Sequence, residues 1–256
     1  MSKAPLSILK IGGKIIEQPE VLEQVLYSFS QLKGPKILVH GGGKRASQLG
    51  QQLGIAAQMI EGRRVTDAAT LEIVTMVYAG LYNKKLVALL QAKNCNAIGM
   101  SGADGNIIQA HKRQGWEHDY GFAGDIDKIN TTAIQRLLEA AFTPVFCAIT
   151  HDKKGQLLNT NADTIAAQVA QAMASFYEVS LYLCLDFNGV LLDPKDATSI
   201  IAHLNIEAYQ RYQQKGIISG GMIPKLDNAF DTIKAGVSSV KICGPDSIMT
   251  GGTILS

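Results

Sequence analysis

Strand-like and helix-like segments alternate along almost the whole of this 256-residue chain. Short apolar runs, such as Leu6–Ile11 and Lys36–His40, are followed by segments whose apolar residues recur at helical spacing, as in Pro19–Leu32. Strands that are joined by helices in this order form parallel sheets, and helices cover both faces of such sheets. The alternation therefore predicts an α/β fold with a mostly parallel sheet.

The same patterns predict the remaining elements. Further helices are expected at residues 44–53, 67–82, 131–141, 162–173, 206–214 and 223–235, and further strands at residues 96–100, 144–149, 179–185, 239–242 and 253–255. Thr66 or Asp67 can cap the long helix, whose apolar stripe predicts a core face or a subunit interface. The stretch 102–124, rich in Gly, Asp and His, predicts loops and a hairpin. A boundary between two lobes is expected near residues 173–177.

Composition and charge exclude several classes of protein. Hydrophobic residues make up 46% and charged residues 18% of the chain, as in ordinary globular proteins. The 24 basic and 22 acidic residues nearly balance and form no dense basic run, which argues against a nucleic-acid partner. No uninterrupted apolar stretch approaches the roughly 18 residues of a membrane span, and the N-terminus lacks the apolar region of a signal peptide. These features predict a cytoplasmic protein without a membrane partner.

The cysteines and histidines suggest no metal site. The 4 cysteines are widely spaced, form no C-x-x-C pair and lie in or beside apolar runs, so buried reduced thiols are expected. The 5 histidines show no metal-ligand spacing either. No structural metal and no catalytic thiol are therefore predicted.

Two glycine-rich junctions follow the first two predicted strands. The first reads Lys10-Ile11-Gly12-Gly13-Lys14, and the second reads His40-Gly41-Gly42-Gly43-Lys44. A strand that ends in glycines and opens into a helix presents backbone N–H groups that suit a phosphate. The two junctions, each with lysines nearby, indicate a site that handles negative charge.

Two established phosphate-loop patterns compare poorly with these junctions. Neither matches a Walker A loop, since the upstream glycine and the following Ser or Thr are missing. Gly41-x-Gly43-x-x-Ala46 fits the dinucleotide pattern, with Glu61 near the position of a ribose-binding acid, so an NAD-binding oxidoreductase is one alternative. Against this alternative, Glu61 lies in a loop-like stretch, and an equally marked glycine junction precedes Gly41.

Four further polar motifs follow in a specific order. Arg63-Arg64-Val65-Thr66 precedes the long helix, and Asn159-Thr160-Asn161-Ala162-Asp163 lies at a helix start. Asp186-Phe187-Asn188-Gly189 follows an apolar strand, and Ser219-Gly220-Gly221-Met222-Ile223-Pro224-Lys225 leads into another helix. Each motif alone could be a surface arginine pair, a helix cap or a turn, but together with the two glycine junctions they are specific.

With these motifs the sequence resembles the amino-acid kinase family from Leu6 to the C-terminus, and within it the kinases of N-acylated glutamate. The resemblance implies a three-layer αβα sandwich with two lobes, residues 1–173 for the acylglutamate and dimerisation and residues 174–256 for ATP. It implies transfer of the ATP γ-phosphoryl group to the side-chain carboxylate of N-acetyl-L-glutamate, the second step of arginine biosynthesis. N-succinylglutamate, another amino acid or carbamate are alternative acceptors, and a ligand sensor without turnover is the alternative outside enzymes.

The chemistry implied by this resemblance is electrostatic. A carboxylate with a pKa near 4.3 is ionised at neutral pH and needs no general base. It must approach an anionic phosphoryl group, and two like charges ~4 Å apart repel by about 4 kcal/mol at an effective dielectric constant of ~20. Catalysis therefore depends on positioning and on positive groups.

The resemblance also implies residue roles. Lys10 would contact the transferring phosphoryl group, Lys225 the ADP side, and Asp163 would orient both lysines. N–H groups would come from Gly12, Gly42 and Gly43, while Arg64 would bind a substrate carboxylate and Asn159 the amino-acid portion. ATP, with Mg²⁺ held mainly by the nucleotide phosphates and by no predicted protein ligand, would lie along Asp186, Phe187, Asn188, Gly189, Val190, Leu191, Ile217, Ile218 and Ser219.

Two departures from many relatives carry further expectations. Arg63, Lys44 and Arg45 are additional basic residues; they either form solvated surface or include one that recognises another negative group, so that the acyl group is succinyl. The chain begins only a few residues before its first strand, whereas arginine-inhibited relatives carry an N-terminal helix. We therefore expect an arginine-insensitive homodimer.

Overall fold

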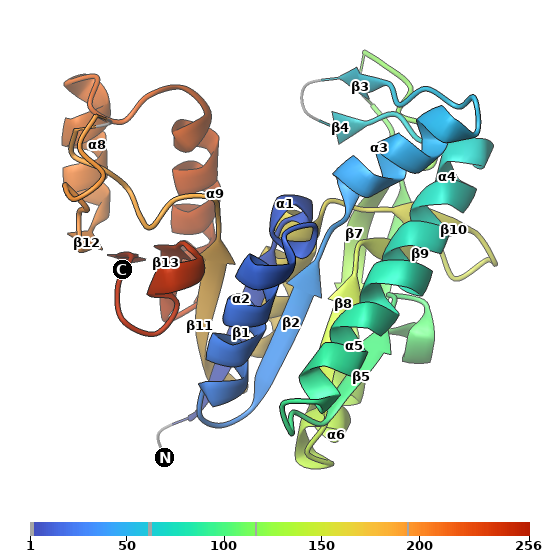
Figure 1. The fold of residues 1–256 in the computed structure, drawn as a ribbon, viewed down its shortest axis with the longest axis horizontal. Helices are drawn as coiled ribbons and strands as arrows, with labels where there is room; N and C mark the ends of the chain where they lie inside the picture. The colour runs from blue at the N-terminus through green and yellow to red at the C-terminus, as the bar shows by residue number, and fades with distance from the viewer. Residues whose placement is uncertain (1–2, 61–62, 116, 194) are drawn as a thin grey trace.

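An eight-stranded sheet forms the centre of the molecule in a computed structural model that describes residues 3–60, 63–115, 117–193 and 195–256. Neighbouring strands are parallel except for one antiparallel pair, β13 (Ser239–Cys243) and β14 (Thr253–Leu255). Figure 1 shows the central strands of this sheet side by side. In spatial order the strands are β12 (His203–Leu204), β14 (Thr253–Leu255), β13 (Ser239–Cys243), β11 (Tyr177–Cys184), β1 (Ala4–Ile11), β2 (Lys36–His40), β8 (Thr143–Cys147) and β5 (Ala97–Met100).

Helices cover both faces of this sheet, which confirms the three-layer αβα arrangement. On one face, α2 (Pro19–Gln31) packs against α5 (Asn83–Gln91). On the other, α7 (Ala162–Met173) packs against β1, β2, β11 and α9 (Ile223–Lys234). The remaining α-helices are α1 (Gly13–Ile16), α3 (Gly43–Gln52), α4 (Ala68–Thr75), α6 (Thr131–Glu139) and α8 (Ile206–Gln214), and short 3₁₀ turns cover Asp104–Asn106, Gly220–Met222 and Pro245–Ser247.

Strand β1 lies in the middle of the sheet and aligns the loops of the site. It pairs with β11 from Ala4↔Tyr177 to Ile11↔Cys184, and on its other edge Ile11 pairs with His40 of β2. The parallel strands β1, β2 and β11 therefore end at the same edge, and the loops that follow them meet there. Ligands of open α/β sheets bind outside the carboxyl ends of the strands.

The long helix predicted over residues 67–82 begins as expected but ends later. Asp67 caps it by accepting a hydrogen bond from the Thr70 amide at 2.7 Å. It then continues through a π-helical segment, Met76–Tyr82, into α5 and ends at Gln91. The wider π turns shift the apolar stripe out of its 3.6-residue period, which explains why residues 83–91 were missed.

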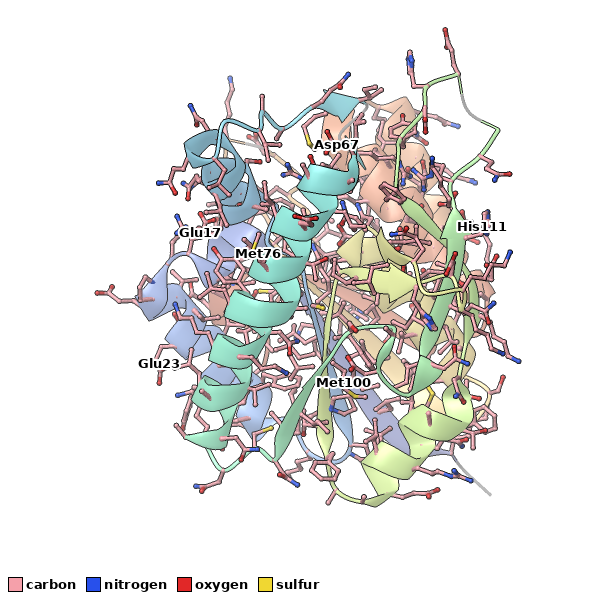
Figure 2. All side chains as sticks on the ribbon, turned by 90° about the vertical axis from the view of Figure 1, so that its right-hand side faces the viewer. Glu17, Glu23, Asp67, Met76, Met100 and His111 are labelled. Carbon is pink, nitrogen blue, oxygen red and sulfur yellow. The ribbon has the colours of Figure 1, made fainter. Side chains whose placement is uncertain are left out.

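This helix also has an unusually apolar composition. Residues Ala68–Gln91 are long and apolar enough to cross a membrane by length and composition alone, with 44% of the most apolar window buried. Figure 2 shows it along one face of the molecule, with Asp67 at its beginning and Met76 part-way along. Its inner side chains, including Val74, Val77 and Leu86, lie in the core of the protein, which accounts for this composition.

A second, four-stranded sheet was predicted only in part. Its strands are β10 (Leu157–Asn159), β9 (Ile149–His151), β6 (Ile108–Lys112) and β7 (Gly124–Ile129), in that order. The hairpin expected within residues 102–124 is only partly correct: β6 lies in that range, but its antiparallel partner β7 begins at the last residue of the range and runs to residue 129. The strand expected at 144–149 divides at Ala148 into β8 and β9, which belong to different sheets. A two-stranded hairpin, β3 (Met59–Ile60) and β4 (Arg63–Arg64), was not predicted.

All 4 cysteines are buried and unpaired, as predicted. Within the described ranges, no three His, Cys, Asp or Glu side chains gather in a way that could hold a metal ion.

Candidate active site

The two glycine junctions lie side by side at the carboxyl edge of the sheet. A Cβ atom added to Gly13 would lie 3.4 Å from both Gly42 Cα and Gly43 N, and one added to Gly41 would lie 3.7 Å from Ala162 Cβ. Helices α3 and α7 begin at Gly43 and Ala162, so their first N–H groups lie at one place. This convergence provides a positive field from two helix N-termini.

Two tyrosines of the π-helical segment hold the second junction. A Cβ atom added to Gly42 would lie 2.8 Å from Tyr78 Cδ1 and 2.8 Å from Tyr82 Cδ2. Both rings are buried, and the Tyr82 hydroxyl donates a 3.3 Å hydrogen bond to Glu17. Burial raises the pKa of Tyr82 to about 12, with a further increase from Glu17, so the hydroxyl stays neutral. Glycine is therefore required at position 42 by the close approach of aromatic rings.

Lys10 and Asp163 form an ion pair beneath the first junction. The Lys10 ammonium lies 2.9 Å from the Asp163 carboxylate, and the lysine residue is only 7% exposed. The cap of α7 is supplied by Asn161, whose side chain accepts from the amides of Asp163 and Thr164 at 2.7 and 3.3 Å. Asp163 is thus available to orient Lys10. The Cβ position of Gly12 is 4.0 Å from the Lys10 ammonium, so this glycine lies directly against the lysine.

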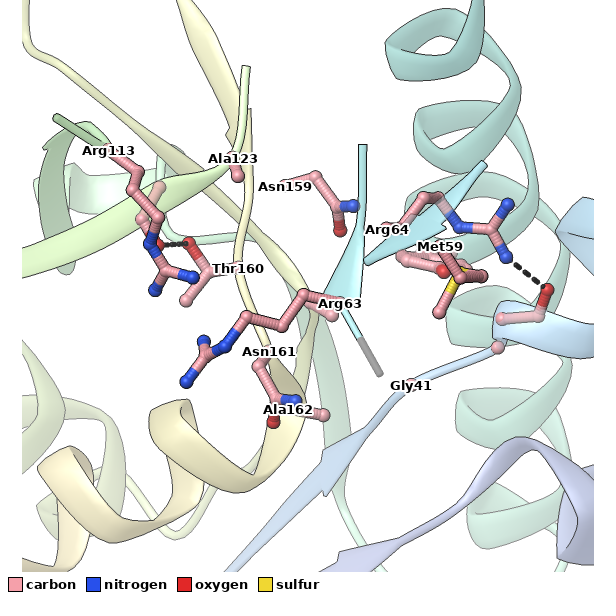
Figure 3. Close-up of a pocket in the computed structure, with 15 residues that line it drawn as sticks. Gly41, Met59, Arg63, Arg64, Arg113, Ala123, Asn159, Thr160, Asn161 and Ala162 are labelled. Carbon is pink, nitrogen blue, oxygen red and sulfur yellow. Dashed lines mark hydrogen bonds between the residues drawn. The ribbon is translucent and has the colours of Figure 1, made fainter. Parts of the chain in front are cut away.

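A cavity of about 200 Å³ that opens to solvent adjoins these groups (Figure 3). Arg64 lines it and donates to the Gly43 carbonyl at 2.8 Å and to the Ser47 hydroxyl at 2.7 Å. Asn159 donates to Thr66 Oγ1 at 3.0 Å, which ties β10 to the loop after β4. The structure thus brings four predicted substrate-binding residues to one cavity: Gly42, Gly43, Arg64 and Asn159.

Arg113 is a cavity residue that sequence reasoning missed. Its guanidinium forms a bidentate pair with Asp125, with Nε 3.1 and 3.0 Å from the two carboxylate oxygens. The pairing keeps the pKa of Asp125 below its usual range. The side chain is 9% exposed and its guanidinium lies 5.6 Å from the centre of the Tyr120 ring. Arg113 belongs to no recognisable motif, so only its position within the predicted hairpin could have indicated it.

The three additional basic residues occupy different places. Arg63 lines the cavity. Lys44 pairs with Glu17 at 3.0 Å on the surface. The positive charge of Arg45 lowers the pKa of Tyr82 and so opposes part of the increase that burial causes. Glu61, the acid of the dinucleotide alternative, lies outside the described residues.

The residues that are predicted to bind the nucleotide follow β11 and α8 along the chain. The loop of Asp186 to Leu191 is anchored where the Val190 amide donates to Thr253 Oγ1 at 2.8 Å, and Asp186 pairs with Lys14 at 2.5 Å. Phe187 and Leu191 are half-buried, Asn188 is exposed, and Gly189 is buried with a φ of 155°. The amides of Ile217 and Ile218 bond to the Tyr212 carbonyl, and Ser219 and Lys225 are exposed at the start of the next helix. Asp163 pairs with Lys10, and among the described residues no ion pair joins it to Lys225.

His40, at the end of β2, is a structural residue. It is fully buried; its Nδ1 lies 2.9 Å from the Gly41 carbonyl, and its Nε2 lies 3.1 Å from the Asn83 amide nitrogen. These partners require a neutral ring that donates from Nδ1 and accepts at Nε2. Burial lowers the pKa of His40 to about 4.

Comparison with known proteins matches this chain to one family. The model of the amino acid kinase family matches residues 5–244. An acetylglutamate kinase of Phocaeicola vulgatus is 50% identical over 254 residues, which cover 99% of each chain. An acetylglutamate kinase of Bacteroides fragilis is 48% identical over 250 residues, which cover 98% of this chain and 96% of the relative. The crystal structure of smu.665 from Streptococcus mutans is 27% identical, covers 98% of both chains and superposes with a TM-score of 0.76.

Proposed function

This chain belongs to the amino acid kinase family, and from that premise we propose that it phosphorylates the side-chain carboxylate of N-acetyl-L-glutamate with ATP. Relatives that are about half identical over nearly the full length carry the name acetylglutamate kinase. The observation that supports the assignment most directly is the cavity in which Arg64 and Asn159 lie beside the glycine junctions and near Lys10. It offers binding groups for an amino acid next to groups for a phosphoryl group.

In the proposed reaction, the acceptor carboxylate attacks the γ-phosphorus without a general base. An acyl phosphate bond forms while the bond to the ADP oxygen breaks, and ADP leaves with the bonding electron pair. Lys10 and the N–H groups at the two junctions would stabilise the negative charge on the phosphoryl oxygens. Asp163 would act as a positioning residue, because its 2.9 Å pair fixes a lysine that is otherwise buried. No histidine is required, which agrees with the neutral, buried His40.

The nucleotide would bind on the β11 side of β1, opposite the β2 side that carries the second glycine junction, and would lie over the loop 186–191 and residues 217–219. Lys225 would contact the phosphate on the ADP side, from the first turn of α9. Mg²⁺ would reach the site on the nucleotide, since the described part of the chain has no cluster of three candidate ligands. The ion would supply charge neutralisation of the phosphates.

We further propose a cytoplasmic homodimer. Met76 and Leu81 of the π-helical segment are 52% and 50% exposed, and Met76 lies on the outside of the long helix in Figure 2. Burial of such residues between two copies would remove apolar surface from water. Light scattering should give about 55 kDa, twice the 27.5 kDa of one chain, and Met76→Asp should shift the mass toward that of the monomer. A monomeric native protein would contradict the proposal.

Hydroxylamine trapping tests the proposed activity, because acyl phosphates react with it to give hydroxamates, which form coloured complexes with Fe³⁺. The protein is incubated with ATP, Mg²⁺ and either N-acetylglutamate, glutamate, aspartate or carbamate. We expect a hydroxamate from N-acetylglutamate that is lost without ATP and in Lys10→Ala. No hydroxamate from any acceptor would contradict the kinase assignment, and an NADH titration would then test the oxidoreductase alternative.

A further inference from the structure

Lys14 is a charged residue of the first glycine junction for which the proposed reaction has no role so far. It directly follows Gly13 and belongs to the short helix α1. Its side chain is 68% exposed, whereas the side chain of Lys10 is 9% exposed and is paired with Asp163. The junction therefore has one lysine fixed on its buried side and a second lysine on its solvent side.

The Lys14 ammonium group reaches the loop that is predicted to hold the nucleotide. It lies 2.5 Å from the carboxylate of Asp186, the first residue of that loop, two residues after the end of β11. The ends of β1 and β11 lie beside each other, because Ile11 and Cys184 are register partners. In Figure 1, α1 lies at the carboxyl end of β1, between β11 and β2. The Lys14–Asp186 pair thus joins the phosphoryl side of the proposed site to its nucleotide side.

This ion pair also lies near Lys10. A hydrogen bond to Cys243 and burial raise the pKa of the Cys184 thiol at the end of β11. Lys10 lowers the same pKa and Asp186 raises it further, so both charges act on one thiol. The ammonium groups of Lys10 and Lys14 therefore lie near each other at the carboxyl edge of the sheet.

The pair of Lys14 with Asp186 suits a ligand with phosphate groups. Exposed ion pairs contribute little to stability, and both partners exchange readily with other charged groups. The Asp186 carboxylate alone would repel phosphates, and the Lys14 charge offsets that repulsion. The long, flexible side chain of lysine can move its ammonium group from a carboxylate to a phosphate without becoming buried and unpaired.

We propose that Lys14 is a phosphate-binding residue whose ammonium group moves from Asp186 to the terminal phosphate of ATP when the nucleotide binds. The inference rests on the proposed kinase function and adds a third lysine to its site. Lys10 contacts the phosphoryl group from the buried side of the junction, and Lys14 contacts it from the solvent side. The phosphoryl group is then held between two ammonium groups while the acceptor carboxylate approaches.

The first experiment measures the Kd of Mg²⁺-ATP and Mg²⁺-ADP by calorimetry, without an acceptor, for the native protein and for Lys14→Ala. We expect the Kd for ATP to rise by tenfold or more, the scale of one charge-assisted hydrogen bond, and the Kd for ADP by threefold or less. Lys14→Arg, which keeps the charge, should restore most of the affinity for ATP. An unchanged Kd for ATP in Lys14→Ala would overturn the proposal, and so would equal losses for ATP and ADP.

Lys44→Ala is the matched control for this substitution. Lys44 directly follows the second glycine junction, its side chain is 61% exposed, and it also pairs with a carboxylate, that of Glu17 at 3.0 Å. Its loss therefore removes the same charge from a similar place, but from a lysine that is not paired with the nucleotide loop. The Kd for ATP should change by less than twofold, and a loss equal to that of Lys14→Ala would contradict a specific contact.

The second experiment separates contact with ATP from anchoring of the loop. Lys14→Ala is introduced into Asp186→Asn, in which the carboxylate partner is already absent. We expect Lys14→Ala to weaken ATP binding in this background by a factor similar to that in the native protein. Loss of the effect would overturn the proposal, because Lys14 would then act only through Asp186.

Turnover separates this inference from the proposed function. In the hydroxamate assay, Lys14→Ala should raise KM for ATP by tenfold or more while KM for N-acetylglutamate changes by less than twofold. Native activity toward N-acetylglutamate with an unchanged KM for ATP in Lys14→Ala would leave the kinase assignment in place and refute the role of Lys14. A native protein that neither binds ATP nor forms a hydroxamate would refute the kinase assignment, and with it any role of Lys14 toward ATP.

Discussion

Substitution of Gly42 by alanine tests whether aromatic packing holds the second glycine junction. The new methyl group would lie 2.8 Å from ring carbons of both Tyr78 and Tyr82, about 0.6 Å closer than ordinary contact. The rings are each 5% exposed, so they can move only by displacing other core groups. Overpacking of this kind costs about 1–3 kcal/mol, partly offset by the reduced backbone freedom of alanine in the unfolded chain. We expect a net loss of about 1–2 kcal/mol, or ~2–8 °C in Tm.

Catalysis should respond more strongly than stability. Tyr78 lines the cavity, and Gly42 directly precedes the first residue of α3, so movement of either displaces the N–H groups of the junction. Misplacement by a fraction of an ångström costs about tenfold or more in kcat/KM. Thermal unfolding and the hydroxamate assay measure the two effects in one preparation.

Gly80→Ala is the matched control for this substitution. Gly80 lies in the same π-helical segment as the two tyrosines, and no atom lies within 4 Å of its Cβ position. This variant should be as stable as the native protein or more stable by up to ~1 kcal/mol, with full activity. A Gly42→Ala protein that matched Gly80→Ala in both Tm and kcat/KM would refute the packing argument.

Three further predictions address the charged groups and the buried histidine. Lys10→Ala should lower kcat far more than it raises KM, and Arg64→Ala should mainly raise KM for the acceptor; equal effects on both constants would contradict these roles. Asp163→Asn should lower kcat by tenfold or more while Tm changes by only a few degrees, because the carboxylate is 48% exposed; full activity would argue against positioning of Lys10. His40 has a pKa of about 4 in the folded protein, below its ordinary value of 6.5. The stabilisation that depends on its neutral ring is therefore fully present above pH 6.5 and is lost as the pH falls toward 4. Between pH 6.5 and pH 4, urea titrations should show the free energy of unfolding falling by ~3 kcal/mol. In His40→Gln the free energy of unfolding should depend less steeply on pH.

Local patterns were sufficient for the elements that begin or end with a strong chemical signal. Pro19 starts α2 and Asp67 caps the long helix, as the sequence indicates. The first two strands also agree closely with the apolar runs. These features depend on neighbours within a few residues, which a sequence displays directly.

The features that the sequence did not reveal depend on distant partners. Arg113 gains its place in the cavity from a pair with Asp125 across a hairpin. The π-helical turns at Tyr78 and Tyr82 lie against a glycine that is 36 and 40 residues earlier in the chain. The sequence also could not show that Asn161 caps α7, which leaves the Asp163 carboxylate available to form an ion pair with Lys10. Each depends on which chain segments meet after folding.

The pairing of β1 with β11 determines whether the two predicted lobes can be produced as separate pieces. Every residue of β1 has a register partner in β11, although β11 begins just beyond the predicted lobe boundary. A chain cut at that boundary would leave both strands with an unpaired edge in the middle of a buried sheet. Exposed edges of this kind recruit other strands and promote aggregation. Co-expression of the two pieces should therefore yield a reconstituted protein, whereas either piece expressed alone should be insoluble.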